Sequence, residues 1–166
     1  HGDEIWVEQG TYVLTNTIVI DKSLAVYGGF DGAETQRDER DWTNHVVTID
    51  GDNSVRCFHV SESNAAAVTL DGLTIARGNT EANSDNGPAA WNGNATGPVF
   101  GELSVVHCTI VSNVAGKHAA IFNDWGNLSV ADSSFLNNTA VNKSGAIINY
   151  GHDLTVARCL FAGNSA

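Results

Sequence analysis

The segment LSVADSSFLNNTA, Leu128 to Ala140, decides the fold because the chain repeats it. It aligns without gaps with LSVVHCTIVSNVA, Leu103 to Ala115, and with LTVARCLFAGNSA, Leu154 to Ala166. The copies begin 25 and 26 residues apart. Repeats of this length are typical of solenoids, in which each unit buries its apolar face against the next unit.

Further pieces of the unit surround these copies. A fourth copy, VTLDGLTIARGNT from Val68 to Thr80, fits with one added residue and begins 35 residues before Leu103. We therefore expect an insertion in the polar segment 81–98, where the chain should leave the repeat as an exposed loop. Two shorter matching pieces precede the last two copies: HAAIFN at 118–123 and SGAIIN at 144–149.

Each unit thus contains three short extended pieces separated by turn residues. Strands this short bury a face only when they coil into a rung and stack on the next rung. The sequence predicts an all-β fold, a right-handed parallel β-helix of six to seven rungs about 4.8 Å apart. The 166 residues suit a single domain 1–166, with capping turns at 1–53 and regular rungs at 54–166.

Equivalent positions of the copies should stack on one another. One predicted stack is apolar and internal: Ile110, Phe135 and Phe161. The other is an asparagine ladder at a turn: Asn113, Asn138 and Asn164. In the less regular front half we expect strands at 5–7, 17–20, 24–27, 46–49 and 57–60. The charged stretch 33–42 predicts one or two helical turns within a loop.

Composition and charge exclude several classes of partner. The chain has 8 basic and 19 acidic residues, a net charge of −11, which argues against nucleic acid and anionic membranes. We find no apolar run of about 18 residues, so membrane insertion by this segment is not expected. The chain opens on His1 and contains no Met, so we expect a mature or excised segment.

Two of the repeated pieces carry a family resemblance. The pieces FLNN at 135–138, FAGN at 161–164 and GAI at 145–147 resemble the paired GGAI and FxxN repeats of the polymorphic outer-membrane proteins. These are bacterial surface passengers with β-helical folds and adhesin roles. The opening stretch from Gly2 to Tyr12 and the piece LAVYGGFDGAE resemble secreted right-handed β-helix repeat proteins.

This resemblance implies a non-catalytic structural or adhesin-like module of a secreted or bacterial cell-surface (outer-membrane) protein. A carbohydrate-active enzyme of the polysaccharide lyase type is the alternative, since lyases of this fold share an acidic calcium cluster with a nearby basic residue. Here Asp50, Asp52 and Asp71 are the calcium candidates and Arg77 the base. Asp-Gly and Asp-Asn pairs are also ordinary turn residues, so we assign no catalytic residue.

The cysteines and histidines show no metal or cofactor motif. Cys108 and Cys159 share a repeat position two rungs apart, a separation too large for a disulfide, so both should be free thiols. The six histidines show no ligand spacing such as H-E-x-x-H. Apart from the calcium option, we therefore expect no cofactor.

Aromatic and apolar side chains suggest two kinds of partner. Trp91, Trp125 and Tyr150 lie in or beside turns, where exposed rings can stack on sugars. The pairs Ile121-Phe122 and Ile147-Ile148 place adjacent apolar residues in a strand, so one member of each should point outward. The outward members should form an apolar stripe edged by Trp125 and Tyr150. We therefore expect a homo-oligomer, with a trimer favoured.

Overall fold

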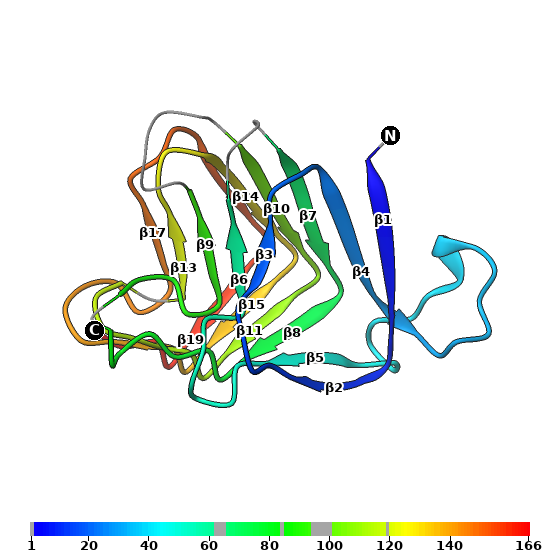
Figure 1. Cartoon of the computed structure of the whole chain (residues 1–166), viewed down its shortest axis with the longest axis horizontal. Coiled ribbons are helices and arrows are strands. Elements are labelled where there is room, and N and C mark those ends of the chain that lie inside the picture. Colours follow the sequence, from blue (N-terminus) through cyan, green and yellow to red (C-terminus); the bar gives the residue numbers. More distant parts are fainter. Residues whose placement is uncertain (1, 62–65, 84, 94–100, 119) are drawn as a thin grey trace.

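The protein is a solenoid of parallel strands arranged in three sheets that enclose one core (Figure 1). The computed structural model describes residues 2–61, 66–83, 85–93, 101–118 and 120–166. The first sheet contains β1 (Asp3–Glu8), β4 (Leu24–Phe30), β7 (Ala67–Asp71), β10 (Glu102–Val106), β14 (Asn127–Ala131) and β18 (Leu154–Ala157).

The other sheets follow the same order along the chain. The second sheet contains β2 (Gly10–Val13), β5 (Val47–Asp50), β8 (Leu73–Ala76), β11 (Thr109–Val111), β15 (Ser134–Leu136) and β19 (Leu160–Ala162). The third sheet contains β3 (Ile18–Ile20), β6 (Phe58–Val60), β9 (Ala90–Asn92), β13 (Ile121–Asn123) and β17 (Ile147–Asn149). β12 (Val114–Ala115) pairs with β16 (Thr139–Ala140). The chain therefore visits the three sheets in turn, and the predicted parallel β-helix is confirmed.

The register stacks equivalent residues as the repeats predict. Ile110 pairs with Phe135 and Phe135 with Phe161, whose rings stack with centroids 4.9 Å apart. In the first sheet, Leu103, Leu128 and Leu154 lie on one another. The side chains of Leu103 and Leu128 are buried in the common core, while the intervening Ser104 and Ser129 are only partly buried. This alternation gives each sheet one apolar inner face.

Two asparagine ladders run along the turns. In the predicted ladder, Asn113 Nδ2 donates to Asn138 Oδ1 at 2.9 Å and Asn138 Nδ2 donates to Asn164 Oδ1 at 2.8 Å. A second ladder, which we did not predict, lies at the turn between the third and first sheets. There Asn92 donates to Asn123 and Asn123 donates to Asn149. Both ladders satisfy backbone carbonyls of the turns, such as Ile110 O and Gly126 O.

The front half joins the same three sheets. Strands β1, β3, β4, β5 and β6 lie at the five segments predicted as strands. Segment 31–46, light blue in Figure 1, lies outside the solenoid between β4 and β5. It contains one 3₁₀ turn, η1 (Arg37–Glu39), in the predicted helical stretch.

The expected insertion was partly wrong. Strand β9 lies within segment 81–98 and pairs with β6 and β13. Its residues Ala90 and Asn92 are fully buried, as is Ala89 directly before it. The extra residues are therefore divided between the two sides of β9. Residues 84 and 94–98 of that segment lie outside the described residues.

The fourth copy needs no added residue. Val68 pairs with Leu103, Ile75 with Ile110 and Asn79 with Val114, each 35 positions apart. Gly78 therefore takes the ladder position, and its backbone N–H donates to Asn113 Oδ1 at 2.8 Å. A Cβ on Gly78 would lie 2.1 Å from Pro88 O, so the close approach of that backbone requires glycine.

Exposed apolar side chains gather on the first and last rungs, where a neighbouring rung covers only one side. In the last rung the exposed members are Leu154, Val156, Leu160 and Phe161. Leu154, Val156 and Phe161 line part of an open hollow of about 530 Å³. No helix in the described ranges is long and apolar enough to cross a membrane.

Candidate functional site

The first two calcium candidates lie together at the end of the second sheet. Asp50 closes β5, and its carboxylate accepts two hydrogen bonds from Arg77 Nε at 2.9 and 3.1 Å and a third from Arg77 Nη2. Arg77 also lies 3.6 Å from Asp52 Oδ1. The hydrogen bonds from Arg77 hold the pKa of Asp50 below its usual value. Arg77 thus occupies the space between the carboxylates that a cation would need.

Asp71 does not join them, which corrects the expected three-carboxylate cluster. Asp50 pairs with Ala76 at the end of β8, whereas Asp71 precedes the first residue of β8. The length of the strand therefore separates the two carboxylates. Asp71 Oδ2 instead accepts from Arg40 Nη2 at 2.7 Å, and Asp71 Oδ1 lies 3.0 Å from His107 Nδ1.

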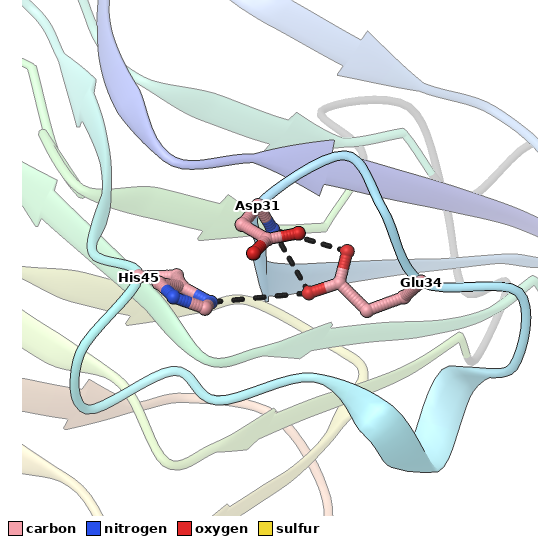
Figure 2. Close-up of side chains that lie close together, drawn as sticks. All are labelled: Asp31, Glu34 and His45. Atoms are coloured by element: carbon pink, nitrogen blue, oxygen red, sulfur yellow. Dashed lines mark hydrogen bonds and ion pairs between the residues drawn. The ribbon is translucent and has the colours of Figure 1, made fainter.

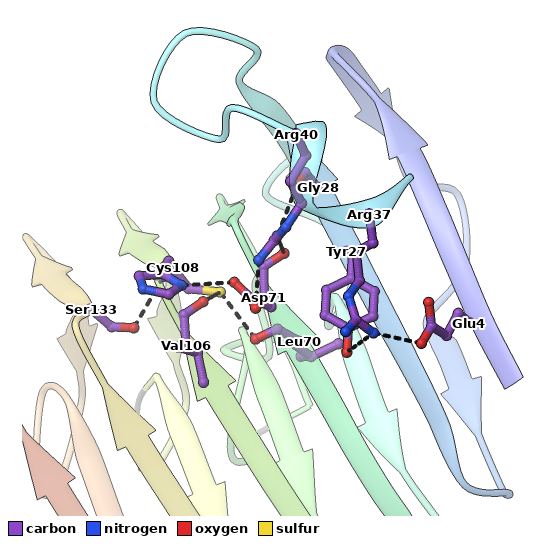
Figure 3. A network of polar contacts seen from close by, with 11 residues as sticks. Glu4, Tyr27, Gly28, Arg37, Arg40, Leu70, Asp71, Val106, Cys108 and Ser133 are labelled. Atoms are coloured by element: carbon purple, nitrogen blue, oxygen red, sulfur yellow. Dashed lines mark hydrogen bonds and ion pairs between the residues drawn. The ribbon is translucent and has the colours of Figure 1, made fainter. Parts of the chain in front are cut away.

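Asp71 belongs to a network that fastens segment 31–46 to the first sheet (Figure 3). The Arg40 side chain is 8% exposed and donates to the carbonyls of Gly28 and Asp71. Its guanidinium lies 5.0 Å from the centroid of the Tyr27 ring and 4.7 Å from that of Trp42. With both rings and three oxygens around it, Arg40 is a buried anchor rather than a free base.

The network continues on both sides of Arg40. Arg37 donates to Glu4 Oε1 at 2.6 Å and to the Tyr27 hydroxyl oxygen at 3.3 Å. His107 stacks on Trp42 with ring centroids 4.4 Å apart. Together with the contacts of Arg40, they join segment 31–46 to four successive rungs, those of β1, β4, β7 and β10, so these side chains hold the loop in place.

Turn residues at the corner between the first and second sheets also pair across rungs. His107, Asp132 and Arg158 occupy equivalent positions with φ near +50°. Arg158 donates two hydrogen bonds to Asp132, each 2.6 Å long. This ion pair joins two successive rungs at the corner.

The outer face of the third sheet carries the expected apolar column. We define the outer column as Val19, His59, Trp91, Phe122 and Ile148, which pair in register. In the pair Ile121-Phe122, Ile121 belongs to the core and Phe122 faces outward. Ile147 packs against the core, and Ile148 lies in the column.

The outer column is less open than the sequence predicts. Phe122 is only 5% exposed, because the His118 ring stacks on it and the Tyr150 ring meets it edge-on. Trp91 stacks on His59 with centroids 4.3 Å apart, and the Arg56 guanidinium lies 4.9 Å from its ring centroid. Of the three aromatics proposed for sugar binding, Trp91 is thus partly buried, while Trp125 and Tyr150 are 48% and 53% exposed.

The three cysteines are free thiols, as predicted for Cys108 and Cys159. Burial raises the pKa of Cys57 and of Cys108 to about 12. Neither thiol is therefore ionised at neutral pH, which leaves both unsuited to nucleophilic chemistry.

Sequence reasoning missed one cluster, Asp31, Glu34 and His45 (Figure 2). Their ligand atoms all lie within 4.8 Å of one another, and within the described residues no second group of three such side chains meets this limit. The residues are too widely spaced for a metal motif, and the loop that joins them has no repeat partner. The one feature of the sequence that could have indicated the cluster is that all three residues lie in the same segment between two strands, β4 and β5.

No family model, curated protein or solved structure matches the chain. The function must therefore be inferred from the contacts of the candidate residues themselves. The acidic groups proposed for catalysis bond to Arg77, Arg40 and His107 within the stack, in an arrangement that joins rungs. Among the remaining features, the exposed side chains are Val19 in the outer column, Trp125 and Tyr150 at the turns, and Asp31 in the cluster of segment 31–46.

Proposed function

We propose that this chain is a non-catalytic structural module of a secreted or cell-surface bacterial protein, with an adhesin-like role. The observation that carries the proposal is that the buried carboxylates bond to arginines of the same chain. Asp50 and Asp71 are 5% and 9% exposed, and each bonds to an arginine that belongs to the scaffold. Carboxylates held in this way stabilise turns and loops, and they are not free to bind calcium or accept a proton from a substrate.

The support for a surface location is the resemblance of the FxxN and GAI pieces to bacterial surface passengers. The FxxN piece has a structural role here, since Phe135 fills the core and Asn138 extends a ladder. A regular solenoid of this kind suits the display of loops and turns on the surface of a larger protein.

The competing enzyme class is tested by incubating the chain with polygalacturonate and a panel of bacterial and plant polysaccharides, with and without calcium. We expect no new reducing ends or unsaturated products and no calcium-dependent shift of the melting temperature. Turnover that is lost in Asp50→Asn and retained in Asp132→Asn would overturn the proposal.

The same proposal includes self-association through the outer column, with a trimer as the expected state. The column presents apolar side chains at Val19 and Ile148 on one straight flank. Light scattering at micromolar concentration should give about three times the 17.5 kDa of one chain. Val19→Lys with Ile148→Lys should reduce the mass, whereas Val141→Lys, an exposed residue outside the column, should not. A mass of one chain would contradict self-association.

A second candidate is sugar binding at the aromatic turns, favoured by the exposure of Trp125 and Tyr150. Strands β13 and β17 that lead into these turns are neighbours in the third sheet, so both rings lie on one edge of the solenoid. A glycan array should show binding that Trp125→Ala abolishes. Trp6→Ala serves as the control, because Trp6 is 40% exposed on the first rung.

A further inference from the structure

Segment 31–46 begins and ends beside the same group of side chains. Asp31 directly follows β4, and His45 lies two positions before β5. Glu34 folds back toward both of them, so that the three side chains meet where the segment leaves and rejoins the solenoid (Figure 2). An interaction among these residues therefore closes the base of the loop.

One ring nitrogen of His45, within the cluster, has no hydrogen-bond partner. This atom, Nδ1, is buried. Glu34 Oε1 lies 3.8 Å from Nδ1, beyond the distance of a hydrogen bond. A buried ring nitrogen without a partner is costly, and it is aimed here at a carboxylate.

Glu34 also lacks a compensating cation. Its side chain is 8% exposed, and its carboxylate accepts backbone N–H bonds from Asp31 at 2.9 and 3.1 Å and from Gly32 at 3.1 Å. Burial raises the pKa of Glu34, but these N–H bonds outweigh that effect and hold the pKa below its usual value. Among the described residues, no lysine or arginine forms an ion pair with Asp31 or Glu34.

We propose that Asp31, Glu34 and His45 bind a first-row divalent metal ion of the zinc or manganese type. One imidazole nitrogen with two carboxylates is a donor set for such ions, whereas calcium prefers oxygen alone. Ligand atoms bound to zinc at about 2.1 Å lie roughly 3.4 Å apart, so the 3.8 Å between His45 Nδ1 and Glu34 Oε1 needs only a small contraction. The ion would give Nδ1 its partner and neutralise the buried carboxylate.

The bound ion would restrict the motion of segment 31–46, which packs against the first sheet. Segment 31–46 supplies Arg37, Arg40 and Trp42, which contact Glu4, Asp71 and His107 on three rungs. Closing the base of this loop restricts its freedom, so metal binding should stabilise these contacts as well.

The test is titration of the whole chain, freed of metal with a chelator, with Zn²⁺ alone and then with Mn²⁺ alone. We expect one saturable site per chain and a higher melting temperature. His45→Gln and Asp31→Asn should each weaken Zn²⁺ binding at least tenfold. His152→Gln should leave the affinity unchanged, since His152 lies in a turn at the other end of the solenoid.

Circular dichroism of the metal-free variants establishes whether each variant is folded, so that a loss of binding is not mistaken for a loss of structure. Asp31 is exposed, and asparagine retains an acceptor for the N–H of Ala33, so Asp31→Asn should fold like the parent chain. A visible spectrum of bound Co²⁺ that changes in His45→Gln would identify the imidazole ligand. Absence of a saturable site for either ion, or equal affinity in the parent and in folded Asp31→Asn and His45→Gln, would overturn the proposal.

Discussion

The side-chain amide of Asn113 donates to Oδ1 of Asn138, 2.9 Å away on the next rung. Both side chains are fully buried. Asn138 Oδ1 also accepts from the backbone N–H of Asn113 at 3.1 Å, and Asn138 Nδ2 donates to Ile110 O at 2.9 Å. The ladder therefore satisfies side chain and backbone together, in a place that water does not reach.

Replacing Asn138 with alanine should destabilise the fold by about 2–4 kcal/mol. The backbone N–H of Asn113 loses its acceptor, and the Asn113 side chain, the Ile110 carbonyl and Asn164 each lose one hydrogen bond. Urea unfolding followed by circular dichroism measures this cost. Asn137→Gly is the matched control, since Asn137 is exposed with φ +52°, a conformation that glycine adopts without strain. A loss in Asn138→Ala no larger than in the control would contradict the ladder.

The apolar stack makes a second prediction. Phe135 is fully buried between Ile110 and Phe161, so Phe135→Ala should cost about 3–5 kcal/mol. Phe161 occupies the same repeat position but is 46% exposed. Phe161→Ala should therefore cost about half as much or less. Equal losses in the two variants, measured by chemical denaturation, would mean that the rungs are not stacked in this register.

The repeats predicted the fold because they determine both the strand alternation and the rung-to-rung register. Leu128 and Val130 fill equivalent core positions to Leu103 and Val105, as a repeat of fixed spacing requires. The Asn138 ladder followed from the same alignment. The free thiol at Cys108 followed from it too, since a position two rungs away lies beyond disulfide reach.

Features outside the repeat were not predictable in the same way. The second ladder was missed although HAAIFN and SGAIIN both end in an asparagine, Asn123 and Asn149, which pair across rungs. Its extension to Asn92 was hidden because an insertion follows that residue. Asp71 was misplaced because we expected it beside Asp50 on the next rung, whereas the register pairs Asp50 with Ala76 at the far end of β8. Coverage of Phe122 by His118 and Tyr150 depends on how the turns fold, which the strand pattern does not specify.

The cysteines should differ sharply in reactivity. Cys57 and Cys108 are buried, and burial raises the pKa of each thiol to about 12, so the reactive thiolate is scarce at neutral pH. Cys159 is partly exposed in the last rung. A short treatment of the native chain with iodoacetamide should therefore label Cys159 first, and the other two only after unfolding, as peptide mass mapping will show. Rapid labelling of native Cys108 would contradict its burial in the turn.

Acid should weaken the contact between Asp50 and Arg77. Hydrogen bonds from Arg77 hold the pKa of Asp50 below its usual value, so the unfolded chain binds a proton at this residue more readily than the native chain does. The resulting stabilisation is complete above about pH 4, the unfolded value, and is lost as the pH falls through the lower native value. Asn at position 50 cannot titrate and should remove this dependence.

Asp50→Asn should therefore cost about 1–2 kcal/mol at neutral pH, a modest value because Arg77 is 44% exposed and solvent screens the pair. The difference in unfolding free energy between the parent and the variant should shrink as the pH is lowered from about 6 to about 3. Urea unfolding across this range, repeated in Arg77→Gln and in the double variant, isolates the coupling of the two residues. A coupling that is constant over the whole range would show that ionised Asp50 does not supply the contact.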